Sequence, residues 1–325
     1  MAAPVRLGLV GCGRIAERGY LPAARDLSGV EFVAFADPDF DRARDVSHFD
    51  PAIGRSKWDM RSESPVFATV DGLVETERVD GLVVATPAEL HVEAAELAAR
   101  AGIPSLVEKP PAPDLVGAMR LAALDPAPAL AFNRRFLQGV ELAPRVPAEG
   151  WLELDLELSF RRGGWGAHVC RDEALLDAGT HLIDLAAFLA DSTPIAVRDA
   201  AIAPERASLE LELGRARARI RCATDGRYAE RIEVRDRAGG LLAANRIGAI
   251  RGRAARLRGA PDPLVRSLRR QLEAFAAAIR GEDRGALAGP ADGVATMATI
   301  EAARRSAELG GAEVTVALPD LAAAR

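Results

Sequence analysis

VRLGLVGCGRIA, residues 5–16, carries the clearest fold signal in this chain of 325 residues. Residues 5–10 form a short apolar run of the kind that becomes a buried strand, and a G-x-G-x-x-A motif follows at once. Gly11 permits a tight turn, Gly13 lets a ligand approach the backbone, and Ala16 keeps the following helix close to the strand. We therefore expect a helix N-terminus here, whose N–H groups and dipole favour a bound pyrophosphate.

Strand and helix signals alternate from this motif to residue 132. Apolar runs predict further strands at 31–36, 81–85, 104–107 and 129–132, and amphipathic segments predict helices at 14–27, 88–101 and 114–124. Thr86 is the expected N-cap of the second of these helices, with Pro87 at its first position. Such alternation predicts an α/β fold, a doubly wound parallel sheet that forms a Rossmann domain over residues 1–132.

The pattern changes after residue 132. Residues 151–160 alternate polar and apolar side chains, as a half-buried strand does, and strand-like runs with turn signals at Asp225-Gly226 and Gly239-Gly240 follow. Helices are expected at 173–189, 264–279 and 293–309. We predict an α+β domain over residues 133–290 with a largely antiparallel sheet, and a C-terminal helix, 291–310, that packs back on the first domain.

Asp37 ends the second expected strand, 21 residues after Ala16. A carboxylate at this place accepts hydrogen bonds from both ribose hydroxyls of a dinucleotide and repels a 2′-phosphate. No basic residue occurs at positions 38–41, and Arg42 is the first one after them. We therefore predict NAD as the cofactor, with NADP the less favoured alternative, although Asp37 before Pro38 also suits a plain turn.

Lys109 is the first candidate for acid–base chemistry. The chain contains 40 arginines and two lysines, Lys57 and Lys109, and the second lies in Glu108-Lys109-Pro110 at the carboxyl end of an expected parallel strand. Ligands of such sheets bind beyond that edge. Arginine cannot release its proton in a protein, whereas lysine can, so the retained lysine indicates proton transfer. The alternative is an ordinary surface lysine.

The segment DAGTHLID, residues 177–184, supplies a second candidate. Asp177, His181 and Asp184 are spaced i, i+4 and i+7, which places them on one face of an expected helix. His181 can move a proton near neutral pH, and Asp177 can orient its ring. The alternative is a buried histidine that is satisfied by a neighbouring carboxylate.

Taken together, these motifs resemble the glucose-fructose oxidoreductase/inositol dehydrogenase family, Gfo/Idh/MocA. Besides the glycine motif, the resemblance rests on Ala85-Thr86-Pro87 with His91, Glu108-Lys109-Pro110, Phe132 to Phe136 (FNRRF), Asp177 to Asp184, and Asp292-Gly293 with Ile300-Glu301-Ala302. It implies that a pyrophosphate is held by Gly11, Gly13, Arg14 and Ile15, that Asp37 binds the adenosine ribose, and that Thr86, Pro87 and His91 line the cofactor groove. It further implies that Glu108 lies beside the nicotinamide, and that Lys109 and His181 form the acid–base pair with Asp177 beside them.

The activity implied by this resemblance is hydride transfer between nicotinamide and a hydroxyl or keto carbon of a sugar, a sugar derivative or a cyclitol. Two alternatives stay open, an NAD-using hydrolase or lyase that oxidises its substrate transiently, and a non-catalytic dinucleotide sensor. The presence of Lys109, Asp177 and His181 argues against the sensor. The expected partner is a small polyhydroxylated substrate, and we expect a homo-oligomer, either a dimer or a tetramer.

Composition excludes several other classes of function. The net charge of −5 gives no overall basic field, so nucleic acid is not an expected partner. No apolar run reaches the roughly 18 residues that a membrane span needs, so no membrane association is expected. The three cysteines are widely spaced and form no metal-binding pattern, which predicts no metal site and suits a cytoplasmic protein.

An arginine-rich segment runs from Arg246 to Arg270, with eight arginines and a single acidic residue, Asp262. Charge runs of this kind are usually solvated loops or helix faces. The alternative is a clamp for an anionic substrate, such as a phosphorylated or nucleotide-linked sugar.

Overall fold

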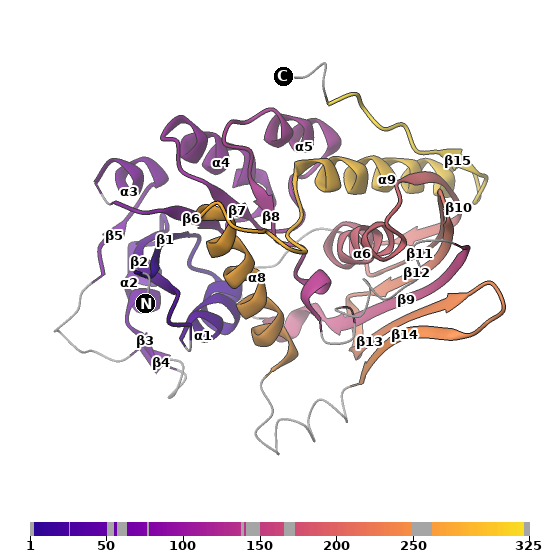
Figure 1. Cartoon of the computed structure of the whole chain (residues 1–325), viewed down its shortest axis with the longest axis horizontal. Coiled ribbons are helices and arrows are strands. Elements are labelled where there is room, and N and C mark those ends of the chain that lie inside the picture. The colour runs from indigo at the N-terminus through magenta and orange to yellow at the C-terminus, as the bar shows by residue number, and fades with distance from the viewer. Residues whose placement is uncertain are drawn as a thin grey trace. The chain divides into compact units, whose positions relative to one another are not determined.

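The computed structural model describes residues 3–25, 27–50, 55–56, 64–76, 78–137, 140, 150–165, 173–248 and 262–321. These residues form two compact units. Unit 1 takes its residues from 1–131 and 263–290, and unit 2 takes its residues from 132–262 and 291–323. The α-helices and β-strands of both units are labelled in Figure 1.

Unit 1 is built on a parallel sheet of six strands in the order β5-β2-β1-β6-β7-β8 (Figure 1). The strands are β1 (Val5–Val10), β2 (Val30–Ala36), β5 (Val66–Phe67), β6 (Gly81–Val84), β7 (Ser105–Val107) and β8 (Ala129–Leu130). All residues of β6 and β7 are buried, which explains why these strands are continuous apolar runs rather than alternating ones. The predicted α/β class is thereby confirmed.

Unit 1 also contains helices and short turns, of which all but the last lie between strands of this sheet in the chain. They are η1 (Ala16–Tyr20), α1 (Leu21–Ala24), α2 (Phe40–Ser47), α3 (Val70–Thr76), η2 (Ala88–Leu90), α4 (His91–Arg100), α5 (Leu115–Ala122) and α8 (Pro263–Ile279), with a small ribbon of β3 (Phe49–Asp50) and β4 (Arg55–Ser56). Asp39 and Asp114 cap α2 and α5 with their carboxylates. The cap expected from Thr86 is absent, because a 3₁₀ turn precedes α4 and Leu90 is the residue before that helix.

Unit 2 contains a sheet of seven strands in the order β14-β13-β9-β12-β11-β10-β15. Its strands are β9 (Leu152–Arg161), β10 (Pro194–Ala203), β11 (Arg206–Leu213), β12 (Ala216–Ala223), β13 (Asp225–Asp236), β14 (Leu241–Gly248) and β15 (Val314–Thr315). Among the described strands of this sheet, only β9 and β12 pair in parallel, so the prediction of a largely antiparallel sheet is confirmed. Asp225-Gly226 opens β13 instead of forming the expected turn, whereas Gly239, with a φ of 87°, does turn the chain between β13 and β14.

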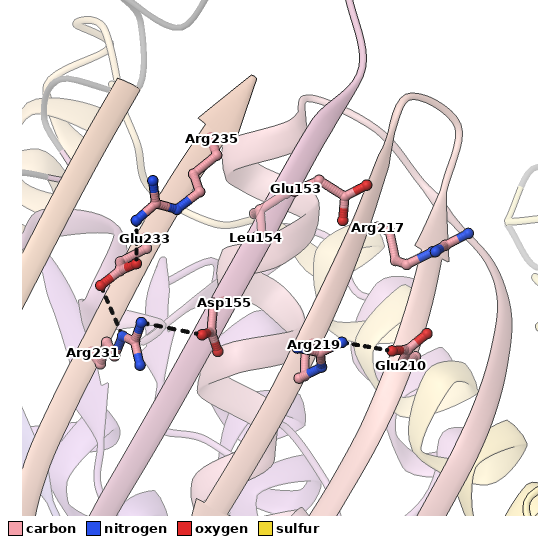
Figure 2. A pocket seen from close by; sticks show the side chains of 9 residues that line it. All are labelled: Glu153, Leu154, Asp155, Glu210, Arg217, Arg219, Arg231, Glu233 and Arg235. Carbon is pink, nitrogen blue, oxygen red and sulfur yellow. Dashed lines mark hydrogen bonds and ion pairs between the residues drawn. The ribbon is translucent and has the colours of Figure 1, made fainter. Parts of the chain in front are cut away.

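One face of the unit 2 sheet is apolar and the other is charged. The apolar face packs against η6 (Leu175–Gly179) and α6 (Thr180–Ala190). Figure 2 shows part of the other face, where acidic side chains of β9 lie beside arginines of β12 and β13. Ion pairs cross between the strands, as from Arg219 to Glu210 at 3.2 Å. The charges of this face are therefore largely compensated within the unit.

Helix α8 and the C-terminal helix belong to different units from those predicted from the sequence. Helix α8 is part of unit 1, since it contacts η1 and α1, and Leu268 packs against Gly19. Helix α9 (Pro290–Glu308) is part of unit 2 from residue 291 on. Asp292 pairs there with Arg135 at 2.9 Å, and Arg304 donates to Glu173 at 2.6 Å. Amphipathic periodicity predicts that a helix has a buried face, but not which sheet receives that face.

In the part of the chain that the structure describes, no helix combines the length and the apolar character needed to cross a membrane.

Glu233 is the most heavily paired carboxylate of the charged sheet face. Its side chain is 1% exposed, and Arg231, Arg235 and Arg246 all bind it. Hydrogen bonds from these arginines lower the pKa of Glu233 from 4.5 to about 2, and the bond from Arg231 contributes most. A carboxyl group with a lowered pKa stabilises the fold above its unfolded pKa and ceases to do so as the pH falls through the folded one.

Glu233→Gln should therefore lower the melting temperature at pH 7, and the difference from the native protein should shrink as the pH falls from about 4.5 towards 2. Thermal unfolding followed by circular dichroism measures this effect. Glu212→Gln on β11 is the matched control, because no ion pair to Glu212 occurs among the described residues. Equal melting temperatures for the Glu233 and Glu212 variants at pH 7 would contradict the role of Glu233.

Candidate functional site

The glycine loop after β1 crosses the end of β6. Gly11 has a φ of 89°, and a Cβ placed on it would lie 2.6 Å from the carbonyl carbon and oxygen of Ala85. No other residue fits there. A Cβ on Gly13, by contrast, would meet no atom within 4 Å, so the backbone at Gly13 borders open space. This geometry fits a dinucleotide pyrophosphate, which needs an uncovered backbone at a helix N-terminus.

Two further residues of the motif lie on the following helix. The helix begins at Arg14 and passes into a π-turn, η1, at Ala16. Arg14 is exposed and binds Glu17 at 2.9 Å, whereas Ile15 is half-buried and lies close to Gly19. The regular helix expected over residues 14–27 is thus interrupted by a π-turn that ends at Tyr20. Single π-turns are frequent at functional sites, and apolar periodicity does not reveal them.

Asp37 lies at the end of β2 and anchors the glycine loop. Its Oδ2 accepts the backbone N–H of Cys12 at 2.8 Å, and its Oδ1 accepts the N–H of Asp39 at 2.9 Å. Arg42 lies 3.6 Å from the same carboxylate. A carboxylate has about four acceptor positions, so two are left for ribose hydroxyls. Both the turn role and the ribose role considered for Asp37 are therefore compatible with this geometry.

Thr86, Pro87 and His91 follow the carboxyl end of β6. Pro87 is exposed and Thr86 half-buried, but the ring of His91 is 1% exposed. Its Nδ1 lies 2.9 Å from the carbonyl oxygen of Pro110, and its Nε2 lies 2.9 Å from that of Thr86. Burial lowers the pKa of His91, and these two carbonyls oppose the shift. The buried imidazole of His91 thus connects the Thr86 segment to the loop that carries Lys109.

Glu108 and Lys109 lie just beyond β7, at the same edge of the parallel sheet as the glycine loop. Oε1 of Glu108 accepts the hydroxyl of Tyr20 at 2.6 Å, and Oε2 accepts the backbone N–H of Lys109 at 3.0 Å. Tyr20 is fully buried, which raises its pKa well above the usual value and keeps the hydroxyl as a donor. The backbone of the half-buried Lys109 is therefore tied to the first helix through Glu108.

In unit 2, a π-turn replaces the first part of the helix expected over residues 173–189. Asp177 lies within this turn, η6, and His181 lies in the α-helix that follows it, α6. The carboxylate of Asp177 accepts hydrogen bonds from Nε and Nη2 of Arg162, at 3.2 and 3.1 Å. His181 is 5% exposed, and its Nε2 lies 3.3 Å from Nη1 of Arg134. The i, i+4 geometry expected of a regular helix thus does not hold between Asp177 and His181.

Asp184 has a structural partner of its own. Its two carboxylate oxygens bind Nε and Nη2 of Arg135 in a bidentate pair, and Asp292 binds the same guanidinium at 2.9 Å. The guanidinium also lies 4.8 Å from the ring centre of Phe188. Asp184 is 1% exposed and Arg135 is 6% exposed, so this cluster holds η3 (Asn133–Phe136), α6 and α9 together.

The sequence did not single out the two tyrosines, Tyr20 and Tyr228, which are the only ones in the chain. Each donates its hydroxyl to a buried glutamate, Tyr20 to Glu108 at 2.6 Å and Tyr228 to Glu230 at 2.9 Å. Glu108 in turn accepts the backbone N–H of Lys109, and Glu230 accepts Nε–H of Arg134, which contacts His181. The rarity of tyrosine here was a usable signal, of the same kind as the rarity of lysine.

The arginine-rich segment 246–270 falls largely outside the described residues, since the structure does not describe 249–261. Arg246 belongs to the charged sheet face, where it pairs with Glu233. Arg266, Arg269 and Arg270 lie on α8. Among the described residues, no group of three or more histidine, cysteine, aspartate or glutamate side chains is placed to hold a metal ion.

The parallel sheet, the open glycine loop and the acidic residue after β2 define unit 1 as a dinucleotide-binding Rossmann unit. Residues 5–126 match the model of the family described as "Oxidoreductase family, NAD-binding Rossmann fold". The match shows that this domain is similar to the NAD-binding domain of Gfo/Idh/MocA oxidoreductases, which confirms the resemblance over residues 5–126 and the assignment of NAD.

Particular relatives extend the comparison. The chain is 27% identical over 193 residues to D-apiose dehydrogenase of Paraburkholderia graminis, an alignment that covers 56% of this chain and 48% of that protein. The chain thus spans about half the length of this curated relative. The fold resembles that of myo-inositol dehydrogenase of Lactobacillus casei in complex with NAD(H) and myo-inositol, with a TM-score of 0.76, 16% identity and 98% of both chains covered. It also resembles the WlbA dehydrogenase of Bordetella pertussis in complex with NADH and UDP-GlcNAcA, with a TM-score of 0.74, 18% identity, and 98% of this chain and 99% of that chain covered.

The native protein should bind NAD more tightly than NADP, and Asp37→Asn should reduce this preference by about tenfold or more. The substitution removes the charge that repels a 2′-phosphate, and such repulsion is worth several kcal/mol. Calorimetric titration of both variants with both cofactors measures the ratio of dissociation constants. Asp39→Asn is the control, because Asp39 carries the same charge two residues away but is 48% exposed and paired with Arg42. An unchanged ratio in Asp37→Asn, or tighter NADP binding by the native protein, would refute the assignment.

Proposed function

We propose that this protein is an NAD-dependent oxidoreductase that moves a hydride to or from a hydroxyl-bearing carbon of a neutral, polyhydroxylated substrate, a sugar, sugar derivative or cyclitol. The observation that carries the proposal is the place of Lys109. It lies at the carboxyl edge of the same parallel sheet as the open glycine loop, in a chain that otherwise uses arginine almost throughout.

The proposed reaction oxidises a carbinol by removing a hydride from its carbon and a proton from its oxygen. Bound NAD supplies the hydride acceptor, and NADH supplies the donor in reverse. Lys109, as a neutral amine, takes the proton from the hydroxyl oxygen and returns it in the opposite direction. Glu108 holds the Lys109 backbone through its bond to the N–H, while the Tyr20 hydroxyl fixes Glu108. His181 and Asp177 are proposed to bind hydroxyl groups of the substrate.

A neutral substrate is supported by the charges around His181. Arg134 pairs with Glu230 at 3.1 Å, and Arg162 pairs with Asp177 at 3.1 Å. Each guanidinium is thus matched by a carboxylate, and the described residues of this cluster offer no surplus positive charge to a phosphate or carboxylate. The relatives that carry the names D-apiose dehydrogenase and myo-inositol dehydrogenase act on or bind molecules of this neutral class. The expected dimer or tetramer stays a prediction.

A panel of sugars and cyclitols incubated with NAD tests the proposal, with NADH absorbance as the measurement. Net NADH formation with one of these compounds is expected. Turnover of a substrate with no net NADH would instead indicate the hydrolase or lyase alternative, and NAD binding without any turnover would indicate a sensor.

Lys109→Arg should lower kcat by roughly 10²–10⁴-fold, because the charge is retained but the transferable proton is lost. The dissociation constant for NAD should stay within about twofold of the native value, since the glycine loop is untouched. Lys57→Arg is the matched control, as it makes the same substitution at the other lysine of the chain. If Lys109→Arg retains more than about a tenth of the native kcat, the acid–base role does not belong to Lys109.

A further inference from the structure

A chain of hydrogen bonds in unit 2 leads from β13 to the ring of His181. The hydroxyl of Tyr228 donates to Oε2 of Glu230 at 2.9 Å, and Nε of Arg134 donates to Oε1 of the same glutamate at 3.1 Å. Nη1 of Arg134 donates to Oδ1 of Asn133 at 3.0 Å and lies 3.3 Å from Nε2 of His181. The guanidinium is therefore held on both of its edges, and one N–H group is directed at the imidazole.

The chemistry of this last contact restricts the ring. A guanidinium has five donors and no acceptor, so a bond between Arg134 and Nε2 requires a lone pair on Nε2. The imidazole is then neutral, with its single proton on Nδ1. An imidazolium would direct an N–H group of its own at the N–H group of Arg134. It would also bring two positive charges side by side.

We propose that Arg134 is a positioning residue that keeps His181 neutral and in the Nδ1–H tautomer. The catalytic consequence rests on the proposed function. While Arg134 is in place, Nε2 cannot give a proton to the substrate, so Lys109 alone transfers the proton at the substrate oxygen. His181 contributes a hydrogen bond from Nδ1–H, which narrows the acid–base role that the sequence assigned to it.

Burial of the Glu230 carboxylate explains why Arg134 stays in this position. The side chain of Glu230 is 1% exposed and that of Arg134 is 14% exposed, so separating the pair would leave a buried charge without its partner. Burial and the neighbouring Glu230 raise the pKa of Tyr228, so its hydroxyl stays protonated and remains a donor. Tyr228 therefore positions Glu230, and Glu230 positions Arg134.

Other charged groups lie on the elements that pack against α6. Asp177 lies on η6 and is paired with Arg162, and Arg135 on η3 is paired with Asp184 of α6 itself. Cys222 lies on β12, and burial raises the pKa of its thiol to about 12, so it stays neutral. The residues that β9 and β11 bury are leucines and an alanine. Arg134 is thus the cation that contacts the ring in this part of the chain.

Nitrogen-15 spectroscopy of the full-length protein tests the proposal without any substrate or cofactor. The chain has four histidines, so long-range proton–nitrogen spectra are simple, and His181→Gln assigns the signals of His181. At neutral pH the native protein should show a protonated Nδ1 and an unprotonated Nε2. In Arg134→Met this pattern should be lost, and on acidification the imidazolium should appear at a higher pH than in the native protein, because the adjacent cation is gone.

Arg221→Met is the matched control, since Arg221 lies on the outer face of the same sheet and pairs with Asp155. This variant should leave the His181 signals unchanged. If Arg134→Met does not fold, Tyr228→Phe is the milder variant, and it should shift the His181 signals in the same direction by loosening Glu230. A protonated Nε2 in the native protein overturns the proposal, and so do His181 signals that are the same with and without Arg134.

Kinetics separate this proposal from the proposed function. Full turnover by His181→Gln, together with the expected nitrogen signals, would remove His181 from the reaction and leave the tautomer assignment intact. A protonated Nε2 in a protein whose Lys109→Arg variant is inactive would overturn the tautomer assignment and leave the oxidoreductase proposal intact.

Discussion

The tightest steric constraint in unit 1 lies at Gly11, where the chain passes over the end of β6. A Cβ there would stand 2.6 Å from backbone atoms of Ala85, so the loop can take this path only with glycine. The same path brings the N–H of Cys12 to Asp37, and the helix that follows brings Tyr20 to Glu108. One tight turn thereby aligns the β2 end, the first helix and the loop of Lys109 along one edge of the sheet.

Buried carboxylates with tyrosine partners recur in both units. Glu108 is held by Tyr20 and accepts the backbone N–H of Lys109. Glu230 is held by Tyr228 and accepts Nε–H of Arg134, which contacts His181. A buried carboxylate is costly unless its oxygens are hydrogen-bonded, so such groups occupy defined positions. The positions of Lys109 and His181 are therefore determined by groups that do not themselves take part in proton transfer.

Sequence periodicity was sufficient for five of the six strands of the parallel sheet, because these are largely buried apolar runs. It did not predict β5, a half-buried strand of two residues, nor the short helices α2 and α3 on either side of it. It was also sufficient for the glycine loop and Asp37, because the loop directly follows β1 and Asp37 directly follows β2. It was insufficient for the π-turns at 16–20 and 175–179, the second of which alters the register between Asp177 and His181. It also did not reveal the partners of Glu230, since Arg134 and Glu230 lie 96 residues apart and their pairing depends on tertiary structure.

If the open backbone at Gly13 receives the pyrophosphate of NAD, a side chain at this position should block the cofactor, and Gly13→Ala provides the test. A Cβ on Gly13 meets no protein atom within 4 Å, so this variant should unfold at the same temperature as the native protein in the absence of cofactor. Its dissociation constant for NAD, measured by calorimetry, should rise by at least about tenfold, because the methyl group occupies the space of the phosphates. Native NAD affinity in a stable Gly13→Ala protein would show that the pyrophosphate does not bind at Gly13.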